Sequence, residues 1–223
     1  MTDRLQRVSS EQVLSRWSEV TSGVPQGSVL GPVLFALCID SLSPICANSA
    51  CFKYADDVTF LHFIRKDSDD VLQSEWNNLE KWSRDVGLFL NLDKCCVMNC
   101  VTKKSLVMKP LTTLNSVTIR TVNTVRLLGV LFSSNLTWND HFSLVTKKCF
   151  KRFFILRNLR NAKCPSFILH RCYVAFIRSV MLYAFPCLCN APKYLMAKFL
   201  CVERRASRFF PGYDFMNFTS AAD

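Results

Sequence analysis

The 223-residue sequence predicts an α+β fold in two parts. Residues 1–135 alternate between short apolar runs of strand character and helical segments, whereas apolar residues recur at helical spacing from about Trp138 onward. Charge separates the chain in a similar way. Residues 141–210 contain 14 Lys or Arg and a single acid, Glu203, while the other 153 residues contain 14 basic and 16 acidic residues. The basic helical part is therefore expected to contact a polyanion.

The first part begins with weakly alternating residues, 1–20, which indicate short strands or loop. A helix is expected over 32–42, because Pro32 suits the first helical position and the preceding glycines and prolines disfavour regular structure. Residues 51–63 predict a strand, a tight turn at Asp56 and Asp57, and a returning strand.

The clearest predicted helix covers 68–86. Its apolar residues repeat at helical spacing, and Gly87 follows as a C-terminal stop. The apolar runs that come next favour strands at 88–100, 116–120 and 125–132.

Two helices are predicted in the basic part. The first starts near Trp138, and the second covers 166–183. One face of the first helix is expected to be buried through Phe142, Val145, Cys149, Phe153 and Leu156. The most apolar long stretch, 168–189, contains His170, Arg171 and Arg178, which favours a buried helix over a membrane span.

Twelve cysteines are scattered through apolar segments, and no secretory signal precedes them. This pattern favours a reduced, intracellular protein with buried free thiols rather than a disulfide framework. Cys187 and Cys189 form a C-x-C pair without a second pair at zinc-site spacing. We expect them to be core residues, with a metal site as the alternative.

Two neighbouring carboxylates, Asp56 and Asp57, interrupt an otherwise apolar segment. Successive side chains of a strand point to opposite faces, so both can serve one site only at the tip of a hairpin. Carboxylates held close together repel each other unless a cation neutralises them, and Mg²⁺ prefers such oxygen ligands. The alternative is an ordinary acidic turn, since Asp is a common turn residue.

Upstream of this pair lies PQGSVLGP, residues 25–32, in which Gly27 and Gly31 permit close approach of another backbone or a base. Together with YADD at 54–57, this segment resembles the reverse transcriptase family, most closely the polymerases of non-LTR (LINE-type) retrotransposons. The resemblance implies a partial polymerase palm, an antiparallel sheet with packed helices, at 1–135. It implies an all-helical basic thumb at 136–223.

The resemblance assigns catalysis and metal binding to Asp56 and Asp57, with Mg²⁺ or Mn²⁺ as the cofactor. It places four further residues near the primer end and the nascent base pair: Gln26, Gly27, Tyr54 and Ala55. The implied partners are an RNA template, a DNA primer and deoxynucleoside triphosphates. A membrane is not expected as a partner.

Downstream segments extend the likeness. GLFLNLDK, 87–94, resembles the motif in which Lys94 protonates the leaving pyrophosphate; the alternative is a solvated lysine after a turn. RLLGV, 126–130, resembles the primer-grip hairpin, in which Gly129 could also mark a strand bulge. The primer-positioning residues are then Arg126, Leu128 and Gly129. The basic face of the thumb comprises Lys147, Lys148, Lys151 and Arg152. We expect it to contact the nucleic-acid backbone; the alternative is a charged surface that only solubilises the protein.

The family pattern also includes a third carboxylate on an earlier strand and fingers that hold the template and nucleotide, and the sequence shows no match to either. Asp3 lies outside any strand pattern, and Asp40 belongs to a predicted helix. Loss of one metal ligand removes much of the electrostatic stabilisation of the transition state. We therefore expect this chain by itself to be inactive in primer extension.

Two function classes follow. The chain is a fragment of a retrotransposon RNA-directed DNA polymerase, or it is an inactive retroelement remnant that binds nucleic acid through its basic thumb. Other polymerase families fit less well. Group II intron and retron reverse transcriptases share YADD but usually carry Ser in place of Gly31, and viral RNA polymerases usually have Gly before the two aspartates.

Overall fold

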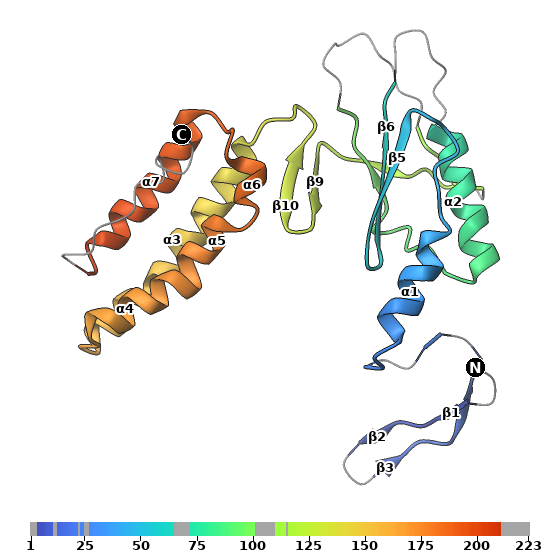
Figure 1. The fold of residues 1–223 in the computed structure, drawn as a ribbon, viewed down its shortest axis with the longest axis horizontal. Coiled ribbons are helices and arrows are strands. Elements are labelled where there is room, and N and C mark those ends of the chain that lie inside the picture. Colours follow the sequence, from blue (N-terminus) through green and yellow to red (C-terminus); the bar gives the residue numbers. More distant parts are fainter. Residues whose placement is uncertain are drawn as a thin grey trace. The chain divides into compact units, whose positions relative to one another are not determined.

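A computed structural model describes residues 4–10, 13–21, 23–24, 27–64, 72–100, 110–114 and 116–210. These residues form an α+β fold, which confirms the predicted class (Figure 1). The chain divides into two compact units. Unit 1 consists of 1–95 with 111–119, and unit 2 consists of 96–110 with 120–223. The assignment of 1–135 to a palm and 136–223 to a thumb stays a prediction.

The described residues of unit 1 form three antiparallel strand pairs and two helices. The pairs are β1 (Arg4–Gln6) with β4 (Ser18–Val20), β2 (Ser9–Ser10) with β3 (Val13–Leu14), and β5 (Ser49–Tyr54) with β6 (Asp57–His62). The helices are α1 (Gly31–Asp40) and α2 (Leu72–Val86). The helix predicted at 32–42 and the hairpin predicted at 51–63 are thus confirmed within two residues at each end.

Polar side chains of α2 tie the loops of unit 1 to that helix. The buried Glu75 carboxylate accepts hydrogen bonds from the N–H groups of Ile45 at 3.1 Å and Cys46 at 2.8 Å. Glu80 Oε2 accepts the N–H of Leu114 at 2.8 Å. These bonds satisfy backbone groups that have no strand partner, so α2 orders two loops in addition to burying its apolar face.

The end of α2 follows the prediction. Gly87 has a φ of 74°, and the Leu88 N–H donates to the Ser83 carbonyl at 2.8 Å, which caps the last turn. The predicted first turn, 68–71, lies outside the described residues.

The strand predicted at 88–100 is mostly wrong. The N–H groups of Lys94 and Cys95 both donate to the Asn91 carbonyl, at 3.1 and 3.2 Å, and form a turn there. Asn and Asp favour such turns through local hydrogen bonding, which overrides the apolar alternation around them. Strand structure in this segment is confined to β7 (Cys96–Val97), and its partner β8 (Arg120–Thr121) is parallel to it.

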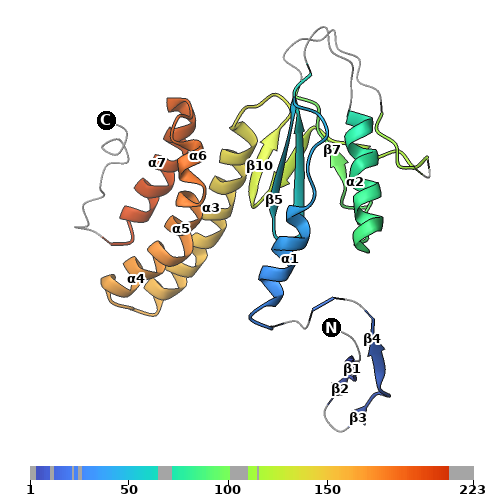
Figure 2. The ribbon, with the colours of Figure 1, turned by 45° about the vertical axis from the view of Figure 1, so that its right-hand side comes forward.

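Unit 2 adds the antiparallel hairpin β9 (Thr124–Leu127) and β10 (Val130–Ser133), followed by helices. The helices are α3 (Asn139–Asn161), α4 (Ser166–Tyr173), a π-helical turn η1 (Val174–Arg178), α5 (Ser179–Leu182), α6 (Phe185–Leu188) and α7 (Lys193–Ser207). Figure 1 and Figure 2 show α3 lying beside the α4–α5 rod and α7.

The predicted apolar face of α3 forms the core of unit 2. All five predicted side chains are buried: Phe142, Val145, Cys149, Phe153 and Leu156. The Phe142 ring stacks on Phe199 of α7 with a centroid distance of 4.5 Å. The helix predicted at 166–183 is confirmed as α4, η1 and α5, and Ala184 ends it with a left-handed φ of 59°.

Two expectations about burial are wrong. The stretch 168–189 is only partly buried, since Phe176 and Leu182 are exposed. All cysteines are free, as expected, but Cys149 alone is buried, whereas Cys187 and Cys189 are exposed rather than in the core. Within the described residues, no helix combines the length and apolar character needed to cross a membrane.

Candidate functional site

The two aspartates lie at the end of the β5–β6 hairpin. Tyr54 and Asp57 are the last paired residues of the strands, and Ala55 and Asp56 form the turn between them. Ala55 has a φ of 50°, the positive value that a two-residue hairpin turn requires at its first position. All four residues are exposed. The predicted turn at both aspartates is therefore corrected: Asp56 lies in the turn, whereas Asp57 begins β6.

The hairpin is attached to the C-terminal end of α1. Lys53 Nζ donates to the Asp40 carbonyl at 3.0 Å and lies 3.8 Å from Asp40 Oδ1. Because the Asp40 side chain is 87% exposed, water screens this ion pair, and the bond to the carbonyl is the more reliable anchor. At the other end of the strands, Ser49 Oγ and His62 Nδ1 are 2.9 Å apart.

The carboxylate pair fits a hard divalent cation in donor type but not in donor number. Carboxylate oxygens are the ligands that Mg²⁺ prefers, and this ion takes about six oxygens in octahedral geometry. In the part of the chain that the structure describes, no three His, Cys, Asp or Glu side chains are grouped closely enough to hold a metal ion. Asp56 and Asp57 can therefore supply part of a coordination shell.

The segment before α1 combines a turn with a helix start. Gln26 lies outside the described residues. Gly27 is exposed with a φ of 79°, and no described atom beyond its chain neighbours lies within 4 Å of the position that a Cβ would take. Glycine is thus required there by backbone conformation and not by crowding within this chain. Ser28 Oγ accepts the Gly31 N–H at 3.1 Å. Pro32 lies in the first turn of α1, one position after the helix start at Gly31 and not at the predicted first position.

Lys94 lies in the turn that follows Asn91 and is exposed. Its backbone N–H closes this turn, while its side chain makes no hydrogen bond or ion pair with any described residue. The ammonium group is therefore available to a ligand, and its predicted role as a proton donor stays a prediction.

The β9–β10 hairpin turns at Leu128 and Gly129. Both have positive φ, 44° and 83°, as expected of the tight turn that matches strand twist. Gly129 is thus a turn residue and does not mark a bulge. The Tyr183 hydroxyl donates to the Leu128 carbonyl at 2.5 Å, and a Cβ on Gly129 would lie 3.1 Å from Tyr183 Cε1. Arg126 is exposed on β9, paired with Leu131.

A second set of contacts attaches this hairpin to the start of α3. His141 is 2% exposed, and its Nδ1 accepts the Leu131 N–H at 3.1 Å. Burial lowers the pKa of His141 below its ordinary value, and the nearby charges of Lys148 and Arg126 lower it further. Ser133 Oγ donates to Asp140 Oδ2 at 2.8 Å. The hairpin and the helices therefore form one packed body.

A family comparison bears on these features together. Residues 3–132 match the family model described as reverse transcriptase (RNA-dependent DNA polymerase), and the matched range contains the aspartate hairpin and nearly all of the β9–β10 hairpin. The chain belongs to the reverse transcriptase family. Reverse transcriptases generally depend on divalent metal ions and use a nucleic-acid template with nucleotide substrates.

The similar curated proteins come from transposons of Drosophila melanogaster. A probable RNA-directed DNA polymerase from transposon BS is 28% identical over 203 residues, which cover 84% of this chain and 22% of the relative. One from transposon X-element is 29% identical over 140 residues, which cover 60% of this chain and 15% of the relative. A putative 115 kDa protein in type-1 retrotransposable element R1DM is 29% identical over 137 residues, which cover 58% of this chain and 13% of the relative.

These matches confirm the prediction of a non-LTR retrotransposon reverse transcriptase. The chain spans about a fifth or less of the length of these relatives. No solved structure matches it.

Part of the basic face predicted on α3 makes contacts within the fold. Lys147 and Lys151 are exposed, and Lys148 is half-buried. Arg152 is half-buried and donates to the Phe176 carbonyl at 2.6 Å, which joins α3 to η1. Three lysines are thus free of structural bonds among the described residues, whereas Arg152 also has a structural role.

Glu203 decides the surface charge of the helices. It is the single acid of 141–210, and it is 5% exposed. Tyr173 Oη donates to Glu203 Oε1 at 3.4 Å. Burial raises the pKa of Glu203, against the opposing influences of Arg178 and of this hydrogen bond. Because this carboxylate is buried, the described surface contributed by 141–210 bears cationic side chains and no acidic one.

Sequence reasoning missed the positioning roles of Tyr183 and His141. An Asp-His pair just after Trp138 at a helix start was the available signal for His141. Nothing local marked Tyr183, because its partner Leu128 is 55 residues away in the sequence.

Proposed function

We propose that this chain supplies the catalytic hairpin and the thumb of an RNA-directed DNA polymerase. Residues 1–135 contribute to the palm, and 136–223 form the thumb. The observation that carries the proposal is the exposed pair Asp56–Asp57 at the end of β5–β6, in a chain of the reverse transcriptase family. A short hairpin presents both carboxylates to a phosphate-bound cation with little backbone rearrangement.

Asp56 and Asp57 hold Mg²⁺ or Mn²⁺ through their carboxylate oxygens. When bound, such an ion neutralises the charge that develops on the reacting phosphate. The remaining contacts position the reactants. The residues that lie near the primer end and the nascent base pair are Gln26, Gly27, Tyr54 and Ala55.

Three further groups serve the same reaction. Lys94 donates a proton to the leaving pyrophosphate, because its ammonium group is exposed and unpaired among the described residues. Arg126 binds the primer backbone from β9, while Leu128 and Gly129 shape the turn beside it. The thumb contacts phosphates through Lys147, Lys148, Lys151 and Arg152.

A chimeric polymerase tests the aspartate assignment. The chain replaces the matching segment of the transposon BS relative, and primer extension is measured on an RNA template with Mg²⁺. Asp57→Asn is expected to lower the rate by about 10²–10³-fold, because it removes a charge that stabilises the transition state. Asp85→Asn, which neutralises an exposed acid at the end of α2, is the matched control and should leave the rate unchanged. Equal rates for Asp57→Asn and the unmodified chimera would refute the assignment.

The isolated chain is expected to give no extension on poly(rA)/oligo(dT) with Mg²⁺ or Mn²⁺. Its described residues bring together two carboxylates and no third metal-ligating side chain. Extension that disappears with Asp57→Asn would contradict this expectation.

The second candidate function is nucleic-acid binding without catalysis. It is favoured by the burial of Glu203, which leaves 141–210 with cationic side chains alone on its described surface. Affinity for an RNA–DNA hybrid should fall steeply between low and moderate salt, since bound phosphates release counterions. Lys147→Gln, Lys148→Gln and Lys151→Gln should each reduce the salt slope by about one. An affinity that does not change with salt would exclude this function.

A further inference from the structure

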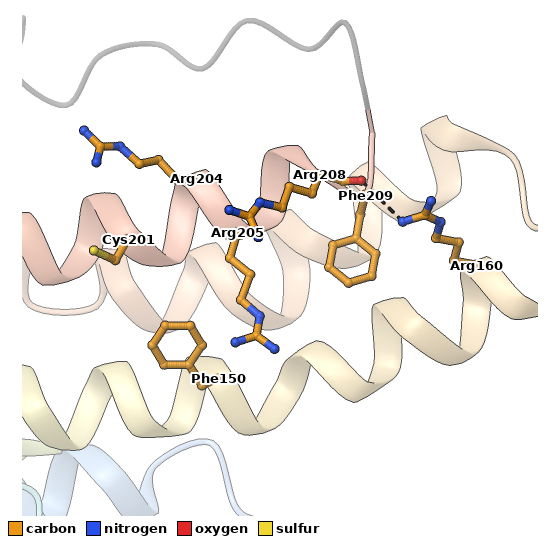
Figure 3. A pocket seen from close by; sticks show the side chains of 7 residues that line it. All are labelled: Phe150, Arg160, Cys201, Arg204, Arg205, Arg208 and Phe209. Carbon is orange, nitrogen blue, oxygen red and sulfur yellow. Dashed lines mark hydrogen bonds between the residues drawn. The ribbon is translucent and has the colours of Figure 1, made fainter.

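A groove between α3 and α7 gathers four arginines (Figure 3). Its volume is about 640 Å³, which is in the range of sites for small molecules or one to a few nucleotides. The rings of Phe150 and Phe209 line it together with Cys201. The basic residues are Arg160 from α3, Arg204 and Arg205 from α7, and Arg208 just after α7. None of these residues belongs to the lysine face proposed for the thumb.

Among the residues that the structure describes, no acidic side chain balances the charge of this groove. No acidic side chain lines it, and none of its four arginines has an ion-pair partner among the described residues. Arg204 and Arg208 are four positions apart, the spacing at which like charges on a helix destabilise each other. The neighbouring acid, Glu203, is buried and bonded to Tyr173. A bound anion would remove this repulsion.

Aromatic contacts hold two of the guanidinium groups in place. The Arg205 Cζ lies 5.2 Å from the Phe150 ring centroid and 5.4 Å from that of Phe153. The Arg160 Cζ lies 5.9 Å from the Phe209 centroid, and its Nη1 donates to the Arg208 carbonyl at 3.4 Å. Guanidinium groups restrained in this way lose less entropy when they bind phosphate oxygens.

We propose that this groove binds the phosphodiester backbone of single-stranded nucleic acid. Planar guanidinium forks match phosphate oxygens, and aromatic rings with stacked guanidinium planes offer surfaces for unpaired bases. A paired duplex presents phosphates but no free base faces, which favours the single strand as the occupant. The proposal goes beyond the polymerase function above and does not depend on the aspartate pair or the lysine face.

Fluorescence anisotropy of a labelled oligo(U) 12-mer with the full chain tests the groove. The variant R160Q/R204Q/R208Q keeps Arg205, which packs on the core, and should weaken binding about tenfold or more and reduce the salt slope by up to about three. The control K163Q/R171Q/K193Q removes the same charge from exposed positions that do not line the groove. It should change the affinity about twofold or less. Equal losses in the two variants would overturn the proposal, since they would indicate diffuse charge.

Alkylation of the unmodified chain tests the groove without substitutions, so the result does not depend on whether a variant folds. Oligo(U) should slow the reaction of iodoacetamide with Cys201, followed by peptide mass spectrometry, and should not slow it at the exposed Cys187 and Cys189. Unchanged labelling of Cys201 would overturn the proposal. Equal protection by poly-glutamate at matched charge would also overturn it and indicate an acidic protein segment instead.

The outcomes separate this site from the proposed thumb face. Substitution of Lys147, Lys148 and Lys151 should weaken binding of the hybrid duplex and leave Cys201 protection by oligo(U) intact. Loss of protection in that lysine variant would contradict a separate groove site.

Discussion

Unit 1 and unit 2 depend on different balances of polar and apolar contacts. The core of unit 2 is continuous, and Phe142, Cys149 and Leu156 are 0% exposed. Unit 1 is held by polar bonds from α2 and leaves large apolar side chains in solvent, with Val29 90% and Phe89 100% exposed. The aspartate hairpin thus belongs to the unit with fewer apolar contacts, and the basic groove belongs to the well-packed unit. Substitutions should reveal this difference.

The largest expected effect comes from the core of unit 2. Phe142→Ala should lower the free energy of unfolding by about 3–5 kcal/mol, because it removes a fully buried ring that stacks on Phe199. Phe154→Ala is the matched control on the same helix; its side chain is 59% exposed, and the change should cost less than about 1 kcal/mol. Urea denaturation followed by circular dichroism measures both. Similar costs for the two variants would contradict a continuous core.

The next effect concerns the polar bonds of unit 1. Glu75→Gln should cost about 1.5–3 kcal/mol, since a carboxylate that accepts two backbone N–H groups is replaced by an amide that can accept only through one oxygen. Hydrogen exchange should accelerate at the amides of Ile45 and Cys46. Asp85→Asn, an exposed acid on the same helix, should change neither quantity. Unchanged exchange at Ile45 and Cys46 in Glu75→Gln would show that the loop is ordered by other contacts.

Substitution of one glycine in each unit compares the cost of the same change in unit 1 and unit 2. Gly87→Ala introduces only a strained φ of 74° in open space and should cost about 1 kcal/mol. Gly129→Ala adds a contact of 3.1 Å with the Tyr183 ring and should cost about 2 kcal/mol. In a Tyr183→Ala background, the extra cost of Gly129→Ala should disappear, which a double-mutant cycle measures. An unchanged cost in that background would rule out the contact as its cause.

The smallest expected effect is a pH dependence in unit 2. The pKa of His141 is lowered by burial and then by Lys148 and Arg126, so the unfolded chain binds this proton more readily than the folded chain. Stability should therefore fall as pH drops from about 7.5 through 6.5. His170, whose pKa is lowered by burial and Arg178, acts in the same direction.

His141→Gln measures the share that belongs to His141. The decrease in melting temperature between pH 7.5 and pH 5.5 should be smaller in this variant than in the unmodified chain, with His170 responsible for part of the remainder. An equal decrease in both proteins would assign the pH dependence to other groups.

Local patterns predicted the parts of the fold whose causes are local. Helical spacing identified the buried face of α3, and glycine at position 87 identified the end of α2. The strand predicted at 88–100 was mostly wrong because a turn at Asn91 overrides the apolar alternation of this segment. The prediction for Cys187 and Cys189 failed because their apolar character does not indicate which side of a helix faces the core.

The candidate site shows the same division. The apolar pattern of 51–63 predicted a hairpin with both aspartates in its turn. In the structure the turn lies one residue earlier, at Ala55 and Asp56, because Tyr54 pairs with Asp57. Tyr183 and the arginine groove could not be predicted, since each depends on helices that meet across the sequence.

The sequence by itself determined the family, the aspartate hairpin and the excess of basic residues in the helical part. These properties reside in short motifs, turn chemistry and composition, which act between neighbours along the chain. Only the tertiary structure decided where the charge lies. The packing of α7 buries Glu203 and places Arg205 beside Phe150, although the latter two residues are far apart in sequence. Burial and long-range contact depend on how complete helices pack. This packing buries the acid Glu203 in the core and places four arginines along one groove.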